Sequence, residues 1–388
     1  MKAPTMFVAG VLLSGLALAC SWSSRVLEAS PLNAQASRSI IKAASSPVRT
    51  DWRVGAPIAF EKLTIFPVIS DQPVSSTEFI TLDQGLLSGK VIITELGANG
   101  RSRRINRRQL SETPEVNRLA LTNKSGKSLV LIAGEMLLGG QQDRIVGHDC
   151  IIEASNTPVP FDVFCVEHGR WSGEGAFGQQ GGAAVASGAG SGSGSGSRAG
   201  LADSDRRTGV VAPMALPKIR EKAQAQKSQG DVWTAVAETV TVNRAVSSTG
   251  DLKSVYQNKR VNSRLDDYDR AFKSKLSAAS VVGVIAAVGG KIVSADVFAS
   301  HALFQAYWPK MLKSYALESV STIDASKQQV NRIDAEAFLA RSQGTGDSEG
   351  KAGVYRLAEN QSGSDASFEL QYTKTGSTLV HFNRVTKR

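Results

Sequence analysis

A glycine-rich run between Gly173 and Gly200 divides this 388-residue chain and limits what the two flanking parts can form. It contains the segment SGAGSGSGSGS, which buries too little apolar surface to offset the entropy lost on ordering. Neither GKS nor GKT follows the run, so it does not have the sequence of a phosphate-binding loop. We therefore expect a disordered Gly/Ser-rich insertion over residues 172–205, with a folded part on each side.

The part before the insertion has the sequence of strands. Its short apolar runs are bounded by glycine, proline and other turn residues, which is typical of strands. These runs are residues 56–69, 79–87, 89–96, 116–122, 128–133, 145–153 and 159–166. The turn residues 124–127 predict a hairpin between the fourth and fifth runs, and the turn-rich residues 154–158 allow another between the last two.

The part after the insertion resumes near Arg206 and combines helices with a hairpin. Apolar side chains at helical spacing predict helices over residues 230–245 and 265–278. Pro309 predicts the start of a further helix. Gly289-Gly290 between two apolar runs is the strongest hairpin signal in the chain.

The C-terminal residues complete an α+β protein. Residues 322–353 are polar and poorly patterned, whereas residues 367–384 read as a closing hairpin. We predict an antiparallel strand-rich sheet or sandwich that takes strands from both sides of the insertion, with helices concentrated in the second half. Residues 51–171 and 206–320 would form two parts of one domain, and residues 321–388 a polar tail with the closing hairpin.

The N-terminus has the sequence of an export signal. Lys2 precedes an apolar run that is too short to span a membrane and ends in Ala17-Leu18-Ala19. We therefore expect residues 1–19 to be a signal peptide. Ala-Leu-Ala-Cys resembles a bacterial lipobox in which Cys20 carries the lipid, whereas ordinary cleavage would release the protein. We expect a periplasmic or outer-membrane lipoprotein, otherwise a secreted protein, with residues 20–50 as a flexible tether.

The net charge of +10 points to an anionic partner. Basic runs such as residues 101–108 and 384–388 read as exposed, and no aromatic residues are interleaved to stack on bases. We therefore expect no nucleic-acid binding. Anionic lipid or cell-wall polymer is the more natural partner of an exported basic protein.

The segment 129–171 carries the densest set of polar groups between apolar runs. Arg144 and Arg170 offer guanidinium forks for phosphate or carboxylate, and Trp171 offers a stacking face. The candidate ligand-binding residues are Glu135, Gln142, Asp143, Arg144, Glu167, Arg170 and Trp171. Alternatively, Glu135, Asp143 and Glu167 neutralise the arginines inside the fold.

Two cysteines, Cys150 and Cys165, lie on neighbouring apolar runs of this segment. They form either a disulfide or two buried reduced thiols, because a one-residue change of register would separate them. With His148 and His168 they make an alternative zinc ligand set, although the set lacks a tight CxxC spacing. We expect no metal and no cofactor.

Several segments of the chain resemble the ARPP-1 family, whose name refers to ADP-ribosyl glycohydrolase and rhodanese-phosphatase associated proteins. These segments are GEMLLGGQQDR from Gly134, CVEHGRW from Cys165, VW at Val232, and VVGVIAAVGGKIVSADVFASHALFQAYWPKMLKSYAL from Val281. The resemblance covers roughly residues 52–171 and 230–320. It implies a strand-rich domain and a link to ADP-ribose or other NAD-derived chemistry.

No catalytic motif accompanies this resemblance. HExxH is absent, and His301 and His381 have no recognisable partner motif. We therefore expect an exported protein that binds a small anionic ligand or an envelope protein. An uncharacterised hydrolase of ADP-ribose-like or phosphorylated substrates and a structural envelope scaffold remain as alternatives.

Overall fold

The computed structural model describes residues 51–72, 74–96, 117–169, 212–323, 329–341 and 346–388. The expected signal peptide, the tether and the glycine-rich insertion lie outside these described residues. Arg170 and Trp171 also lie outside them.

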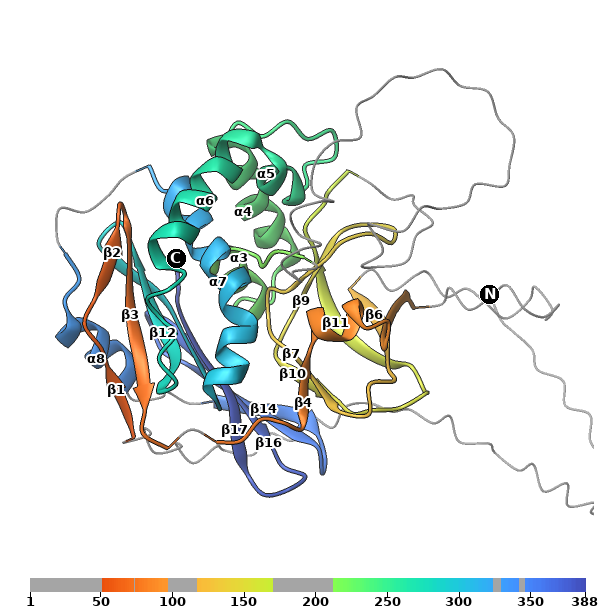
Figure 1. The fold of residues 1–388 in the computed structure, drawn as a ribbon. Helices are drawn as coiled ribbons and strands as arrows, with labels where there is room; N and C mark the ends of the chain where they lie inside the picture. Colours follow the sequence, from red (N-terminus) through yellow and green to blue (C-terminus); the bar gives the residue numbers. More distant parts are fainter. Residues whose placement is uncertain (1–50, 73, 97–116, 170–211, 324–328, 342–345) are drawn as a thin grey trace, which may run out of the picture. The chain divides into compact units, whose positions relative to one another are not determined.

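The largest element is a nine-stranded antiparallel sheet built from both sides of the insertion (Figure 1). Its strand order is β1-β3-β12-β13-β17-β16-β15-β14, and β2 pairs with β3 beside this path. The strands are β1 (Trp52–Val54), β2 (Ile58–Phe60), β3 (Leu63–Ser70), β12 (Val281–Val288), β13 (Lys291–Phe298), β14 (Gly346–Lys351), β15 (Tyr355–Gln361), β16 (Asp365–Tyr372) and β17 (Thr378–Thr386). The pairing of β3 with β12 joins the two parts of the chain, as the sequence predicts.

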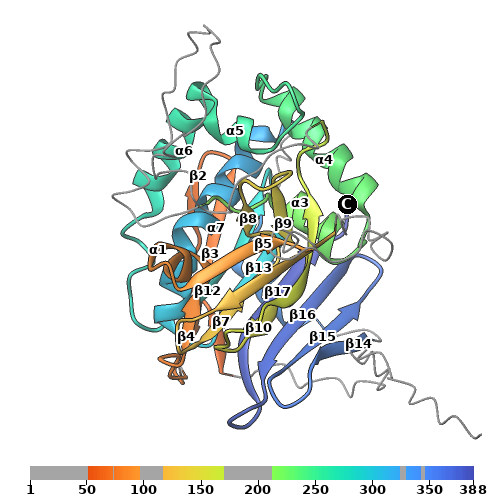
Figure 2. The ribbon, with the colours of Figure 1, turned by 90° about the vertical axis from the view of Figure 1, so that its right-hand side faces the viewer.

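Two smaller sheets are formed by the segment before the insertion (Figure 2). One has the order β10-β7-β4, and the other has the order β5-β6-β11-β9-β8. Their strands are β4 (Phe79–Thr81), β5 (Val91–Glu95), β6 (Arg118–Asn123), β7 (Ser128–Leu131), β8 (Met136–Leu137), β9 (Arg144–Val146), β10 (Cys150–Ile152) and β11 (Val159–Cys165). All pairs are antiparallel except β4 with β7.

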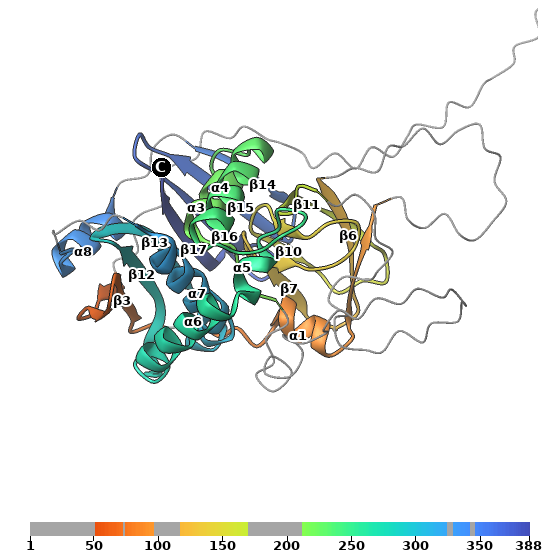
Figure 3. The ribbon, with the colours of Figure 1, turned by 90° about the horizontal axis from the view of Figure 1, so that it is seen from above.

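Six of the seven helices in the described residues follow the insertion, which confirms the predicted α+β class. The helices are α1 (Leu82–Leu87), α3 (Pro217–Gln224), α4 (Gln229–Val242), α5 (Lys253–Gln257), α6 (Lys259–Phe272), α7 (His301–Ser321) and α8 (Arg332–Ala340). In Figure 3, α7 and α8 lie on opposite faces of the large sheet, and their buried side chains belong to separate core clusters. None of the described helices is long and apolar enough to cross a bilayer.

Both glycine-marked hairpins after the insertion are confirmed. Gly289 and Gly290 have φ values of +57° and +79°, and two positive φ values are what a two-residue type I′ turn requires. This turn connects β12 to β13, and the closing hairpin connects β16 to β17. β17 also pairs with β13, so the closing hairpin is part of the large sheet.

The predicted hairpin between residues 116–122 and 128–133 is wrong. β6 pairs with β5 and β11, whereas β7 pairs with β4 and β10 in a different sheet. Asn123 lies at the point of separation, and its side-chain amide donates to Lys127 O and Ile152 O at 2.8 Å each. The Asn123 side chain thus stabilises the turn through which the chain leaves the sheet of β6 and enters the sheet of β7.

Three local expectations also change. Pro309 lies inside α7, which begins instead after Ser300, whose hydroxyl accepts from Leu303 N at 3.1 Å. Residues 79–87 form β4 followed by α1, because Thr81 and Gln84 make a capping box. The helix expected over residues 265–278 is α6, which begins after its cap Asn258.

Asp296 of β13, which is fully buried, is the centre of a polar network beneath α7. Arg220 of α3 donates two hydrogen bonds to it, at 2.7 Å from Nη2 and 3.3 Å from Nη1. Ser294, Tyr315 and Asn383 donate further hydrogen bonds to the same carboxylate. Burial alone raises the pKa of a carboxyl, but Arg220 and the other donors hold the pKa of Asp296 well below its usual range.

His381 of β17 lies between two aspartates in the same network. Its Nδ1 is 2.6 Å from Asp149 Oδ2, and its Nε2 is 3.3 Å from Asp296 Oδ1. Phe298 stacks on the imidazole at a centroid distance of 4.5 Å. Burial alone would lower the pKa of His381, but the two carboxylates raise it to about 9. The imidazole is therefore protonated at neutral pH.

Lys310 of α7 is the centre of a second buried ionic cluster. Its Nζ lies 2.7 Å from both Asp83 Oδ2 and Glu135 Oε1. The other oxygen of Glu135 accepts from Ile132 N at 2.9 Å. Although burial alone lowers the pKa of a lysine, the two carboxylates raise the pKa of Lys310 above its usual value. The cluster joins the segment before the insertion to the segment after it.

The network predicts a fall in stability at alkaline pH. Because the folded-state pKa of His381 is about 9 and its ordinary value is 6.5, protonation stabilises the fold fully below pH 6.5 and progressively less as pH rises through 9. The free energy of unfolding should fall by about 3 kcal/mol across this range. Urea unfolding at several pH values measures it, and His381→Gln should remove the dependence. Constant wild-type stability would contradict the assignment.

Gly134 allows Arg220 to reach Asp296, and this close approach predicts a severe effect of substitution. A Cβ at Gly134 would lie 2.4 Å from Arg220 Cγ, and the φ of this residue is +88°. Gly134→Ala should therefore cost more than about 3 kcal/mol of stability, as strain and clash combine. Gly126, with φ of +80° and open space around it, is the matched control. Gly126→Ala should cost about 1 kcal/mol in the same urea measurement.

Candidate functional site

The described members of the sequence-predicted ligand set lie in the protein interior. Their exposed fractions are 4% or less, and the residues are Glu135, Gln142, Asp143, Arg144 and Glu167. Glu135 belongs to the Lys310 cluster and is thus an ion-pair partner within the fold. The structure therefore does not place these five side chains on an accessible surface.

Hydrogen bonds within this group hold a glycine turn. Gly139 and Gly140 have φ values of +115° and +60°, and Asp143 Oδ1 accepts from Gly139 N at 2.8 Å. Glu167 Oε2 accepts from Asp143 N at 3.0 Å, and Gln142 Nε2 donates to Glu167 O at 2.9 Å. The Gly139 N–H is thus occupied by the Asp143 carboxylate and does not face an external anion. Gly139 and Gly140 therefore have the role of a turn.

The four residues of the alternative zinc set have different surroundings. Cys150 of β10 lies opposite Leu131 of β7. Cys165 of β11 lies opposite Arg144 of β9. Both thiols are free and buried, which agrees with the reduced alternative, and burial raises the pKa of each. His148 lies 3.9 Å from Asp162 and Glu349, and the His168 ring packs edge-on against Trp233. The described residues contain no group of His, Cys, Asp and Glu that could hold a metal ion.

The basic run expected at residues 384–388 is not wholly exposed. Arg384 is 1% exposed on β17, where its guanidinium donates to Phe338 O at 2.7 Å and Arg341 O at 2.8 Å. β-Strand alternation turns this side chain inward against α8. Part of the positive charge counted from the sequence is therefore not available to an external partner.

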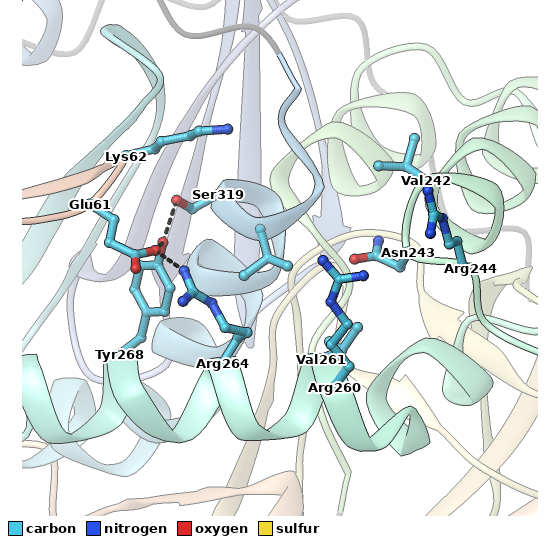
Figure 4. A pocket seen from close by; sticks show the side chains of 11 residues that line it. Glu61, Lys62, Val242, Asn243, Arg244, Arg260, Val261, Arg264, Tyr268 and Ser319 are labelled. Atoms are coloured by element: carbon cyan, nitrogen blue, oxygen red, sulfur yellow. Dashed lines mark hydrogen bonds and ion pairs between the residues drawn. The ribbon is translucent and has the colours of Figure 1, made fainter.

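A cavity of about 490 Å³ brings together other cationic side chains (Figure 4). It lies between the β2–β3 turn, the end of α4, the first turns of α6 and the end of α7. Its lining residues are Glu61, Lys62, Val242, Asn243, Arg244, Arg260, Val261, Arg264, Tyr268, Ser319 and Val320. A cavity of this size can accommodate a small-molecule ligand.

One acidic side chain in the lining is already engaged. Glu61 forms an ion pair with Arg264, and its Oε2 accepts from Tyr268 OH at 2.9 Å. The same hydroxyl lies 2.9 Å from Ser319 Oγ. Burial, together with the Glu61 carboxylate, raises the pKa of Tyr268 to about 12. Tyr268 is therefore a neutral hydroxyl at the cavity wall.

The other cations of the lining have no carboxylate partner in the part of the chain that the structure describes. Among the described residues, no acidic side chain forms an ion pair with Lys62, Arg244 or Arg260. Lys62 Nζ donates to the backbone oxygen of Thr322 at 2.5 Å. The cavity thus carries an excess of positive charge, and Figure 4 shows Arg260 and Arg264 on the same side of α6.

Arg244 occupies a backbone position that favours glycine. α4 ends in a Schellman motif, in which Ala245 N donates to Val240 O and Arg244 N donates to Thr241 O, both at 3.0 Å. Arg244 has a φ of +50°, where a Cβ costs about 1 kcal/mol or more. Glu61, at +53°, is a second lining residue with this conformation. Two of the three non-glycine residues with positive φ in the described part of the chain thus lie in the cavity lining.

Sequence reasoning missed this site because its residues come from four separate segments. One signal was readable, since Arg260 and Arg264 are four residues apart and so share a helix face. Another was the arginine that follows α4 where a glycine cap is usual. Neither signal identifies the partners from β2–β3 and α7.

Arg244 allows function and stability to be separated. Arg244→Gly should increase the free energy of unfolding by about 1 kcal/mol, because it relieves the left-handed strain, yet it removes a cation from the lining and should weaken the binding of an added anion such as pyrophosphate. Lys227 is the matched control, since its φ is +52° and it lies outside the cavity lining. Lys227→Gly should leave anion binding unchanged. Calorimetry and urea unfolding measure the two effects, and unchanged binding in Arg244→Gly would exclude this side chain from the site.

Comparison with known proteins identifies one family. The model of the ARG and Rhodanese-Phosphatase-superfamily-associated Protein domain, ARPP-1, matches residues 51–385 and so confirms the resemblance of the motifs. The match spans both sides of the insertion and includes the C-terminal strands. No curated protein and no solved structure matches the chain. Because the family model covers most of the chain, this protein belongs to the ARPP-1 family.

Proposed function

We propose that this ARPP-1 protein binds a small anionic ligand in the cavity between β2–β3, α4, α6 and α7. The observation that carries the proposal is the excess charge of the lining, in which Lys62, Arg244 and Arg260 have no carboxylate partner among the described residues. Guanidinium groups bind phosphate and carboxylate oxygens through paired hydrogen bonds. Phosphate-bearing molecules are therefore the ligand class that fits best.

The lining favours binding over catalysis. It contains no histidine, cysteine or aspartate among the described residues, and its carboxylate, Glu61, is held by Arg264 and Tyr268. A hydrolase needs an acid–base group or a nucleophile within reach of its substrate. The family name gives a reason to test ADP-ribose, which carries two phosphates, as a ligand.

The test compares two neighbouring cations of α6. Arg260→Gln should weaken binding of pyrophosphate or ADP-ribose by about tenfold or more, because a charge-assisted hydrogen bond is lost. Lys259 is adjacent on the same helix and lies outside the cavity lining. Lys259→Gln removes the same charge and should change affinity by less than about twofold. Isothermal titration calorimetry at fixed ionic strength measures both.

Equal effects of the two substitutions would show that only long-range charge matters and would contradict a built site. If the wild-type chain binds none of the probes, the scaffold alternative becomes the better description. Turnover of ADP-ribose or of a phosphate ester would instead favour the hydrolase alternative.

We also propose that the protein acts in the bacterial envelope. The support is the apolar run, the small residues 17–19 and the following Cys20, which fit export and lipid attachment. Lipidation at Cys20 would anchor the protein to a membrane through the tether. Otherwise, cleavage at the same boundary would release it.

Cys20 provides the test of this location. Cys20→Ala should move the protein from the membrane fraction to the soluble exported fraction, because the lipid attachment atom is lost. Ser21→Ala is the control and should leave fractionation unchanged. Mass spectrometry of the mature N-terminus measures the lipid directly, and an unmodified Cys20 in the wild type would contradict the lipoprotein assignment.

A further inference from the structure

Exposed apolar side chains border the basic cavity. Among the described residues, Val242, Val246 and Ile323 are large hydrophobic residues with exposed fractions of 38%, 95% and 75%. Val242 is part of the cavity lining, and Val246 follows Arg244 by two residues. The backbone oxygen of Ile323 lies 3.4 Å from Lys62 Nζ. Exposed apolar residues thus lie next to cationic residues of the lining, along the chain or in contact with them.

The remaining exposed hydrophobic residues lie on other elements. They are Leu87 at the end of α1, Ile92 on β5 and Ile333 on α8. Isolated exposed apolar residues are ordinary on protein surfaces. Three of them at or next to residues that line or contact a cationic cavity form a different pattern, which we call the rim and define as Val242, Val246 and Ile323.

We propose that the anion recognised by the cavity is the phosphate headgroup of an anionic phospholipid, with the rim inserted at the boundary between headgroups and acyl chains. This proposal rests on the proposed anion binding and specifies its ligand. A soluble phosphate ester needs the cations but gains nothing from an apolar rim. A lipid in a bilayer uses both, because its charge and its apolar chains are presented together.

Charge complementarity supports a bilayer as the occupant. Lys62, Arg244 and Arg260 offer positive charge without an acidic partner among the described residues, and anionic lipid surfaces attract such groups within a Debye length. Arg260 lies in the first turn of α6, at the positive end of the helix dipole. The rim residues are aliphatic, which suits shallow insertion below the headgroups.

Vesicle binding tests the proposal. The full mature chain with Cys20→Ala, which removes the lipid anchor, is sedimented with vesicles of phosphatidylglycerol mixed with phosphatidylcholine, or of phosphatidylcholine alone. We expect binding to the first and not to the second. Ile323→Ser and Arg260→Gln should each weaken vesicle binding by about tenfold, because each removes one of the two contributions.

The control separates the rim from general hydrophobicity. Ile333 is 71% exposed, close to the 75% of Ile323, but it lies on α8. Ile333→Ser should leave vesicle binding unchanged. Ile323→Ser should retain wild-type affinity for pyrophosphate in calorimetry, which shows that the variant is folded and that its cavity is intact.

The outcomes distinguish this inference from the function on which it rests. Binding of pyrophosphate without binding of anionic vesicles would overturn the lipid assignment and leave a site for a soluble phosphate ligand. Vesicle binding that is insensitive to both Ile323→Ser and Arg260→Gln would overturn it as well, because another surface would be responsible. Binding of neither probe would overturn both proposals.

Discussion

The buried charge of Asp296 is the constraint on which the rest of this fold depends. A carboxylate removed from water must be matched by donors, and here α3, α7, β13 and β17 each supply one or more. His381 extends the network to Asp149, and Lys310 joins the two parts of the chain a second time. These contacts specify how the helices after the insertion pack against the strands before it.

The protein uses cationic side chains in two opposite ways. Arg220, Lys310 and Arg384 are buried and matched by carboxylates or backbone oxygens, so they stabilise one arrangement of elements. Around the cavity, Arg244 and Arg260 are exposed and have no acidic partner among the described residues. Cations without a carboxylate partner beside a cavity are available to an external anion, which is why we propose the binding site there.

The proposed envelope location bears on the same surface. A tether after Cys20 would hold the domain close to a bilayer, where anionic headgroups are concentrated. Once the lipid on Cys20 is inserted, binding of a headgroup by the cavity would be intramolecular. A weak contact between the cavity and the headgroup would then be sufficient. A cavity that combines cations with an aliphatic rim is suited to that setting.

The sequence by itself determined the local structures. Gly289-Gly290 fixed the central hairpin, apolar spacing placed α4, the order of runs gave the α+β class, and the sequence motifs indicated the family. Tertiary structure decided the rest, because the contacts involved join residues far apart in the chain. The sequence could not show that β6 leaves β7 for another sheet, and it left open whether Glu135 and Arg144 are accessible or interior. Nor could it show that Lys62, Arg244 and Arg260 meet at one cavity, since a charged residue reads as exposed until its neighbours in space are known.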